Sequence, residues 1–345
     1  MDLSEVVIFL DKDWDKYQTK FKLALESDVS FLSEINQVII SNLGKQLRPI
    51  LLLLAARLSS QGEMLGEQVA GTSLREQTSG SALREQTYNY AAAVEIIHNA
   101  TLLHDDVADN STHRRGMATV FSQFGAAPAV LLGDYWLAKS VSLIMENNDL
   151  DTRVMASFSK TISDLAEGEL LQLEKSETLD TKKEDYYKII YGKTASLFET
   201  ALVSGAYSVD AQDSYVSALK DYATSIGYAF QIRDDIFDYT PSAKIGKNVG
   251  VDILEKKITL PFIGALLNSE GNNDEYLDKV RNIDNYPEYK EQILNFVIEN
   301  NGLEYAQEQL NLHIDKAIAS LSIFPDKKEK EYLIALARFV GNRQI

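Results

Sequence analysis

Residues 91–109 read AAAVEIIHNATLLHDDVAD, and this stretch says most about the fold. Wound as a helix, residues 91–103 place apolar side chains on nearly every side. Such a helix belongs in the centre of a large helical bundle rather than on its surface. The same helix then ends in three carboxylates, Asp105, Asp106 and Asp109, of which the first and last share a helix face.

The rest of the chain has the same helical character. Apolar residues recur every three or four positions through most of its 345 residues, for example in 21–25, 31–39 and 215–226. The sequence contains only six prolines, it lacks alternating strand patterns bounded by turns, and no Gly-rich loop follows a strand-like run. We therefore expect an all-α fold, organised as a single domain over residues 1–345.

Two polar stretches interrupt this pattern. Residues 61–87 are rich in Gly, Ser, Thr, Gln and Glu and contain LREQT twice, at 74–78 and 83–87. A spacing of nine residues is too short for a solenoid repeat, so we predict a flexible surface insertion between two helices, and a functional lid is the less favoured alternative. Residues 269–285, with several Asn and Asp, are expected to connect two helices.

Composition excludes several classes of protein. The 45% of hydrophobic residues suffice for a large core, and a net charge of −17 opposes binding to nucleic acid. The chain has no cysteine, its acidic first fifteen residues lack the features of a secretory signal, and its longest aliphatic run, 50–56, is too short to span a bilayer. We expect a cytoplasmic protein that binds anionic substrates only through well-placed cations and metal ions.

A second acidic cluster repeats the spacing of the first. Residues 231–238 read QIRDDIFD, so Asp234, Asp235 and Asp238 again form a DDxxD pattern after an apolar stretch. One acidic triplet is most simply a solvated helix end, but like charges four residues apart destabilise a helix, so two such clusters indicate a compensating cation. Carboxylates that combine with waters and phosphate oxygens are typical Mg²⁺ ligands, whereas the Ca²⁺ loop of an EF-hand and an HExxH zinc motif are missing.

From about Asn42 onward the chain resembles the trans-isoprenyl diphosphate synthase, or polyprenyl synthetase, family. Besides the two aspartate motifs, the matching features in order are GKQLRP at 44–49, RRG at 114–116, GD at 133–134, EGE at 167–169 with Gln172, KT at 193–194 and GK at 246–247. This resemblance implies a single bundle of long helices around a deep apolar cavity, in a homodimer, with both clusters at the cavity mouth.

The resemblance also implies an activity and assigns roles to residues. Proteins of this family ionise an allylic diphosphate and join the cation to isopentenyl diphosphate; about three Mg²⁺ ions would be held by Asp105, Asp106, Asp109, Asp234, Asp235 and Asp238. It places isopentenyl diphosphate against Lys45, Arg48, His98 and Arg115. Asp134, Glu169 and Gln172 are expected to support the site without direct ligation. It places the allylic diphosphate against Arg114, Lys193, Thr194, Gln231, Lys247 and Lys257, with Lys193 also in the catalytic set and Lys256 as an alternative to Lys257.

Product length is expected to depend on the two residues that lie five and four positions before the first motif. Short-chain members of the family often have an aromatic side chain there, whereas this chain has Ala100 and Thr101, which would leave a tunnel open. The resemblance therefore predicts products longer than C20, in the hexaprenyl to decaprenyl range, with transient membrane contact for their release. The chain departs from the family at Leu43 and Gln46, which predicts an altered geometry for isopentenyl diphosphate.

Three other functions remain open. A short-chain synthase would make farnesyl or geranylgeranyl diphosphate. A class I terpene cyclase would use a DDxxD site but would not need Lys45, Arg48 or the Arg114–Arg115 pair. A non-catalytic partner subunit should lack intact aspartate motifs, and both are complete here.

Overall fold

The computed structural model describes residues 2–60, 83–146, 151–240, 249–271 and 273–342. Helices dominate this part of the chain, so the expected all-α class is confirmed; the only strands described are β1 (His113–Arg114) and β2 (Met117–Ala118). The N-terminal half contains α1 (Leu3–Leu10), α2 (Lys12–Ala24), α3 (Ser30–Ile40), α4 (Leu47–Ser59), α5 (Glu85–Ala108), α6 (Val120–Phe124) and α7 (Ala126–Met145). The rest contains α8 (Thr152–Thr178), α9 (Lys183–Ile190), the π-helical turn η1 (Tyr191–Ala195), α10 (Ser196–Tyr207), α11 (Asp213–Asp238), α12 (Val251–Leu254), α13 (Leu260–Asn268), α14 (Asn273–Arg281), α15 (Tyr289–Glu299), α16 (Gly302–Ser320), the 3₁₀ turn η2 (Leu321–Ile323) and α17 (Lys328–Asn342).

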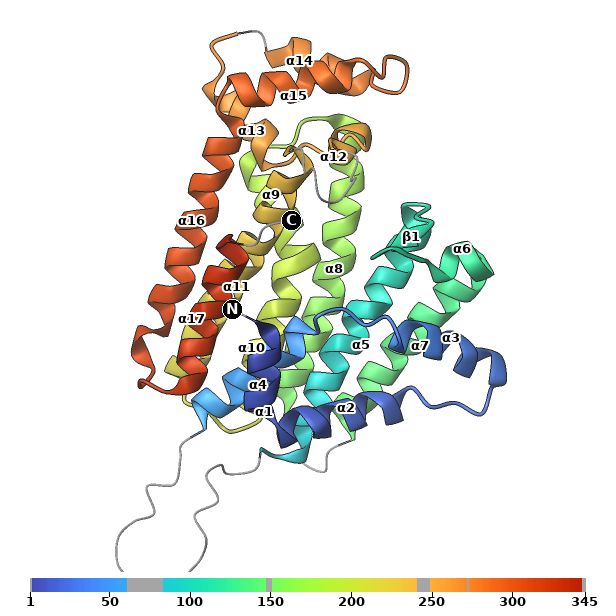
Figure 1. Cartoon of the computed structure of the whole chain (residues 1–345), viewed down its shortest axis with the longest axis vertical. Helices are drawn as coiled ribbons and strands as arrows, with labels where there is room; N and C mark the ends of the chain where they lie inside the picture. The colour runs from blue at the N-terminus through green and yellow to red at the C-terminus, as the bar shows by residue number, and fades with distance from the viewer. Residues whose placement is uncertain (1, 61–82, 147–150, 241–248, 272, 343–345) are drawn as a thin grey trace, which may run out of the picture.

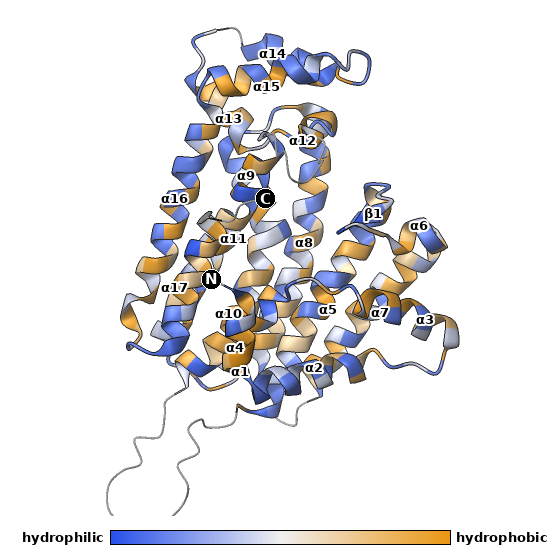
Figure 2. Ribbon diagram, viewed as in Figure 1, coloured by the Kyte–Doolittle hydropathy of each residue, from blue (hydrophilic) through white to orange (hydrophobic). Residues whose placement is uncertain are grey.

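Helix α5 is the buried helix that its sequence predicts. Eleven consecutive residues, from Thr87 to Ile97, are buried. The helix packs against α7, α4, α2 and α10, so neighbours cover it on several sides (Figure 1). Helix α4 is likewise mostly hydrophobic, whereas the peripheral α14 is largely hydrophilic (Figure 2). Removal of apolar surface from water, which stabilises the fold by about 25 cal/mol per Å², explains why these segments take the centre.

The N-terminal helices are fastened to this core by a buried ion pair. Nε of Arg57 on α4 donates to Oδ2 of Asp13 at 2.6 Å, and its two terminal nitrogens donate to the carbonyls of Phe9 and Leu10 at 2.9 and 2.6 Å. The hydroxyl of Tyr88 on α5 donates to Oδ1 of Asp13 at 2.6 Å. Both carboxylate oxygens of Asp13 are thus satisfied in a buried position.

Two expected loop boundaries were wrong. The predicted insertion over 61–87 lies outside the described residues up to 82, but α5 begins at Glu85, and Thr87 is buried with its hydroxyl bonded to Oγ of Ser208 at 2.8 Å. The second LREQT copy therefore leads into the central helix. The stretch 269–285 contains α14, whose acidic first turn and basic last turn suit the helix dipole.

The two helices that carry the aspartate motifs run in the same direction. Both α5 and α11 start at the lower end of the bundle in this view and finish in its upper half, beside β1 and α12 respectively (Figure 1). No helix among the residues described combines the length and hydrophobicity that a bilayer span requires. The single domain and the deep apolar cavity stay predictions.

Candidate functional site

The first aspartate cluster closes the C-terminal end of α5. Asp106 is buried, and its Oδ1 accepts a hydrogen bond from Nε of Arg114 at 2.8 Å. Asp105 is half-buried, and Asp109, the residue that caps the helix, is exposed. The three carboxylates therefore differ in environment, and an arginine already neutralises the middle one.

A short hairpin directs the Arg114–Arg115 pair. Strands β1 and β2 pair antiparallel with Arg114 opposite Met117, and the two loop residues, Arg115 and Gly116, have φ values of 53° and 78°. Positive φ at both loop positions is typical of a type I′ turn, which matches the twist of the strands. The turn separates the two arginines, because Arg114 binds Asp106 while Nη1 of Arg115 donates to the carbonyl of Asn42 at 3.4 Å.

The second cluster lies at the end of α11, and each of its members has a different environment. The Tyr186 hydroxyl donates to Oδ2 of the buried Asp235 at 2.6 Å, and Nε2 of Gln231 donates to its Oδ1 at 3.0 Å. The two oxygens of Asp238 accept hydrogen bonds, each of 3.0 Å, from the backbone N–H groups of Val251 and Asp252 in α12. Asp234 is half-buried.

Lys193 and Thr194 both lie in η1. Nζ of Lys193 forms an ion pair with Glu169 and donates to Oε1 of Gln172 at 3.0 Å. The hydroxyl of Thr194 donates to Oε1 of Gln231 at 2.9 Å. Because Gln231 also binds Asp235, the turn is connected through one amide to the second aspartate cluster.

The neighbouring residues Lys256 and Lys257 have different surroundings. Nζ of Lys256 pairs with Asp284 at 2.5 Å, whereas Lys257 lines a cavity of about 140 Å³ together with Lys193, Asp235 and Asp252. Burial lowers the pKa of Lys257, but Glu255, Asp109 and Asp252 raise it more, so the net shift is upward. Lys257 is therefore the lysine that faces the clusters.

The second cluster lines this cavity through Asp235, and the first cluster lies within electrostatic range of its lysines. Asp109 of the first cluster and Asp252 both raise the pKa of Lys257, and Asp235 and Asp238 of the second cluster raise the pKa of Asp252. Lys193, whose charge acts on Asp105, lines the same cavity as Asp235. Carboxylates from α5 and α11 are thus both within electrostatic range of the lysines of this cavity.

The carboxylates of this site fit a cation whose coordination shell is completed by other ligands. Burial raises the pKa of Asp105 to about 6, Lys193 and Arg114 oppose that rise, and Glu169 and Asp109 add to it. Burial also raises the pKa of Asp235, with smaller contributions from Asp234 and Asp238. Among the described residues no three Asp, Glu or His side chains converge closely enough to hold a metal ion alone. Mg²⁺ needs only one or two carboxylates when waters and phosphate oxygens complete its shell, so these hard oxygen donors fit it.

A second cavity, of about 340 Å³, gathers the residues predicted to bind isopentenyl diphosphate. Lys45, Arg48, His98 and Arg115 all line it. The Arg48 guanidinium lies 4.7 Å from the centroid of the Phe198 ring, and burial lowers its pKa to about 10, which leaves it charged at neutral pH. Burial and the arginines hold the pKa of His98 well below its usual range, so this imidazole is neutral. The cavity combines fixed cations with the apolar walls of Phe198, Phe230 and Phe339.

Comparison with known proteins identifies the family. The polyprenyl synthetase family model matches residues 29–297. The chain belongs to the polyprenyl synthetase family. It is 32% identical to the octaprenyl diphosphate synthase of Haemophilus influenzae over 98% of this chain and 96% of that protein. A decaprenyl diphosphate synthase from Rhodobacter capsulatus superposes with a TM-score of 0.87 at 32% identity, covering 99% of both chains. A polyprenyl synthase from Caulobacter crescentus, complexed with calcium and isoprenyl diphosphate, gives 0.84 at 31% identity, covering 100% of this chain and 98% of that one.

In this polyprenyl synthetase, the two residues predicted to set the length of the product lie about one helical turn before the first cluster. Ala100 is fully buried and Thr101 is half-buried with its hydroxyl bonded to the carbonyl of His98 at 2.8 Å. Lys247, predicted to bind the allylic diphosphate, lies outside the described residues. Gln46, where the chain departs from the family pattern, has a left-handed backbone conformation directly before α4, with φ 49°. Its side-chain amide oxygen accepts a hydrogen bond from Nε2 of Gln18 at 2.7 Å.

Sequence reasoning missed several residues of this polyprenyl synthetase site. Tyr186 orients Asp235 from a position 49 residues earlier, and no local pattern marks it. Glu95 is buried in the second cavity, on the helix side that also carries His98, and its Oε1 accepts from Nδ2 of Asn99 at 3.2 Å. Asp252 could have been suspected, because it follows the second motif within the region of family resemblance.

Proposed function

We propose that this polyprenyl synthetase condenses isopentenyl diphosphate with an allylic diphosphate, such as the geranyl, farnesyl or geranylgeranyl ester, to give a trans-polyprenyl diphosphate. The observation that carries the proposal is a cavity that contains Lys193, Lys257 and Asp235 of the second cluster, lies within electrostatic range of the first cluster, and is accompanied by a separate basic cavity. Two sites with different chemistry suit two diphosphate substrates, one held with metal and one without. The octaprenyl and decaprenyl diphosphate synthases similar to this chain support the same reaction.

The residues that would hold Mg²⁺ are the six aspartates of the two clusters, Asp105, Asp106, Asp109, Asp234, Asp235 and Asp238. Arg114 and Tyr186 donate to Asp106 and Asp235 and would orient these two carboxylates. Bound Mg²⁺, about three ions in all, would supply Lewis-acid stabilisation of a leaving diphosphate. Calcium and isoprenyl diphosphate in the Caulobacter crescentus enzyme support a divalent cation at such a site.

Other polar side chains of this polyprenyl synthetase would bind and orient the two substrates. Lys193, Arg114 and Lys257 would donate to the allylic diphosphate and stabilise the negative charge that grows as its carbon–oxygen bond breaks. Thr194 and Gln231 would orient that group from η1 and α11, and Lys247 would assist. Arg48, Arg115, Lys45 and His98 would hold isopentenyl diphosphate so that its double bond attacks the allylic carbon. The departing diphosphate then accepts the proton whose loss restores neutrality.

Products longer than C20 fit this chain better than short ones. The octaprenyl and decaprenyl synthases are long-chain enzymes by name, and Ala100 and Thr101 place no aromatic side chain beneath the first cluster. A homodimer, a cytoplasmic location and transient membrane contact during product release belong to the same proposal.

The decisive experiment incubates the purified chain alone with Mg²⁺, farnesyl diphosphate and labelled isopentenyl diphosphate. We expect labelled polyprenyl diphosphates longer than C20 by mass spectrometry, and we expect Asp234→Asn to lower turnover by at least about 100-fold. Farnesyl diphosphate converted to a hydrocarbon without uptake of label would indicate a terpene cyclase instead. No conversion by the chain alone, with activity restored by a second protein, would indicate a partner subunit.

A further inference from the structure

The turn that presents Lys193 and Thr194 is held between two neighbouring helices by backbone contact. A Cβ on Gly192 would lie 2.5 Å from the carbonyl oxygen of Asp164 and 2.9 Å from Cα of Gly168, both on α8. On the other side, a Cβ on Gly227 of α11 would lie 2.5 Å from Cα of Ala195. Only glycine permits these approaches, so the first and last parts of η1 are fixed against α8 and α11.

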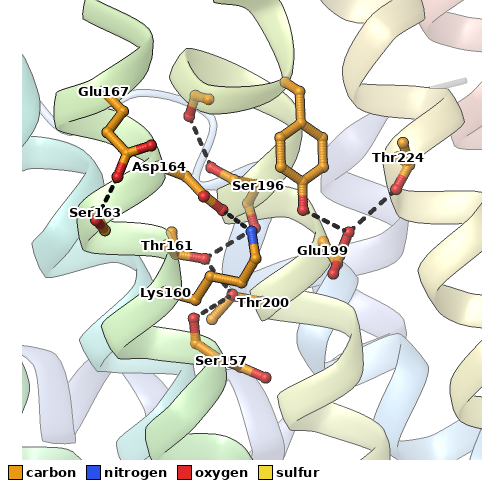
Figure 3. A network of polar contacts seen from close by, with 12 residues as sticks. Ser157, Lys160, Thr161, Ser163, Asp164, Glu167, Ser196, Glu199, Thr200 and Thr224 are labelled. Atoms are coloured by element: carbon orange, nitrogen blue, oxygen red, sulfur yellow. Dashed lines mark hydrogen bonds and ion pairs between the residues drawn. The ribbon is translucent and has the colours of Figure 1, made fainter. Parts of the chain in front are cut away.

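The opposite side of the turn is anchored by a carboxylate. The Tyr191 hydroxyl donates to Oε2 of Glu199 on α10 at 3.1 Å, and the Thr224 hydroxyl of α11 donates to the same oxygen at 3.3 Å (Figure 3). Oε1 of Glu199 pairs with Nζ of Lys220 at 2.9 Å, and the carboxylate is only 14% exposed. Glu199 therefore connects η1, α10 and α11 through three donors.

The carbonyl of Gly192 in the turn and that of Ser196 just after it also accept hydrogen bonds from side chains. The Ser196 hydroxyl donates to the carbonyl of Gly192 at 2.7 Å (Figure 3). Thr161 of α8 donates to the carbonyl of Ser196 at 3.3 Å and lies 2.5 Å from Oγ1 of Thr200. A π turn is a rare and strained insertion that is often retained at functional sites, so such support is needed to keep one geometry.

We propose that Tyr191 and Glu199 are positioning residues, which act through the π turn to hold Lys193 and Thr194 against the allylic diphosphate. This inference rests on the proposed function. Gln172 and Gln231, the partners of Lys193 and Thr194, line the cavity that contains Lys257, whereas Tyr191 and Glu199 are not among its lining residues, so neither touches substrate in this arrangement. Loss of the anchor would let the turn relax toward an ordinary α-helical register and would move both side chains.

The test removes one hydroxyl. We expect Tyr191→Phe to raise the KM for farnesyl diphosphate by about 3- to 10-fold, the effect of one hydrogen bond, while the KM for isopentenyl diphosphate changes by less than about 2-fold. The matched control is Tyr187→Phe, one turn earlier on α9, whose hydroxyl instead contacts Nε2 of His313 at 3.2 Å. That control should leave both KM values unchanged. Thr224→Val, which removes the second donor to Glu199, should reproduce the selective effect more weakly.

A double-mutant cycle separates positioning from general destabilisation. In a Lys193→Ala background, Tyr191→Phe should have a clearly smaller effect on the KM for farnesyl diphosphate, because only the route through Thr194 is left. Equal changes in both KM values, an undiminished effect in that background, or an unchanged KM in Tyr191→Phe would each overturn the inference. A parent protein with no prenyl transfer at all would instead overturn the proposed function.

Discussion

Ala100 has no exposed surface, and replacing it with phenylalanine tests whether a growing chain passes beside it. Overpacking a tight core costs about 1–3 kcal/mol, but a side chain that enters an open tunnel costs less and blocks it. We expect Ala100→Phe to fold and to make shorter products by mass spectrometry. Ala93→Phe, two turns or about 10 Å further from Asp105 on the same helix, should shorten them less. Products of Ala100→Phe as long as the parent's would show that the tunnel lies elsewhere.

His313 gives a prediction about pH. It is buried on α16, where Nε2 lies 3.2 Å from the Tyr187 hydroxyl, and burial, with Lys316 and Lys183 nearby, lowers its pKa to about 4. Because the pKa of His313 is lower in the folded state than in the unfolded state, its contribution to the free energy of unfolding is complete above about pH 6.5. That contribution is lost as the pH falls toward 4. The loss is on the order of 3 kcal/mol. Denaturant titrations of the parent and of His313→Gln should diverge over this window, and parallel curves would contradict the assignment.

The attachment of α1 and α2 to α4 depends on Arg57. Removal of this guanidinium would leave the buried carboxylate of Asp13 with Tyr88 as its one remaining side-chain partner. Breaking such a pair costs about 3–5 kcal/mol. We expect Arg57→Met to lower the free energy of unfolding by that amount and to speed hydrogen exchange in α1 and α2. Lys20→Met, which removes the surface pair with Glu85, should cost less than about 1 kcal/mol. Similar losses in the two variants would refute the distinction.

Elements were predicted well from sequence where burial decides them. The apolar pattern of α5 predicted a central helix, because a side chain that is apolar on every face must be covered on every face. The predicted loop at 269–285 was wrong because Asn and Asp favour turns only as a tendency, and the i,i+4 pair of Lys279 with Glu275 stabilises α14.

The candidate site was predictable only in its residue types. The spacing of the aspartates predicts a shared helix face, but the hydrogen bond from Tyr186 and the choice of Lys257 over Lys256 depend on packing between distant segments. The π turn has no local sequence marker, and the close approach of Gly192 to Gly168 that accompanies it involves another helix. Long-range contacts of this kind are not encoded in local periodicity.

At the scale of the whole molecule, a net charge of −17 opposes the anionic substrates proposed for it. The cations that would bind these substrates come from elements that are far apart in the sequence. Helix α4 supplies Arg48, the hairpin supplies Arg114 and Arg115, and η1 supplies Lys193. Arg48 and Arg115 line one cavity and Lys193 lines the other, so each cavity has cations of its own in a protein of negative net charge.

One face of α7 carries an exposed apolar patch, which we propose as the attachment site of a second copy. Val130, Leu131, Val141 and Met145 are exposed by 39%, 68%, 42% and 54%, and their spacing places them within one arc of the helix. No described segment of the chain covers them. Exposed apolar side chains gathered on one face are typical of an interaction site, and two-fold pairs are the commonest closed assembly.

We therefore expect the chain to form a dimer through α7, and two charges placed on this face should break it. Leu131→Glu combined with Val141→Glu would bury two unpaired carboxylates in the interface, which is far more costly than the apolar contacts they replace. Analytical ultracentrifugation should show a dimer for the parent and a monomer for this variant. The matched control, Leu267→Glu with Leu312→Glu, changes equally apolar side chains, exposed by 62% and 44%, on α13 and α16. That control should remain dimeric, because those two helices lie on another part of the bundle (Figure 1). A dimer that survives the α7 changes but dissociates in the control would place the interface on the opposite side of the molecule.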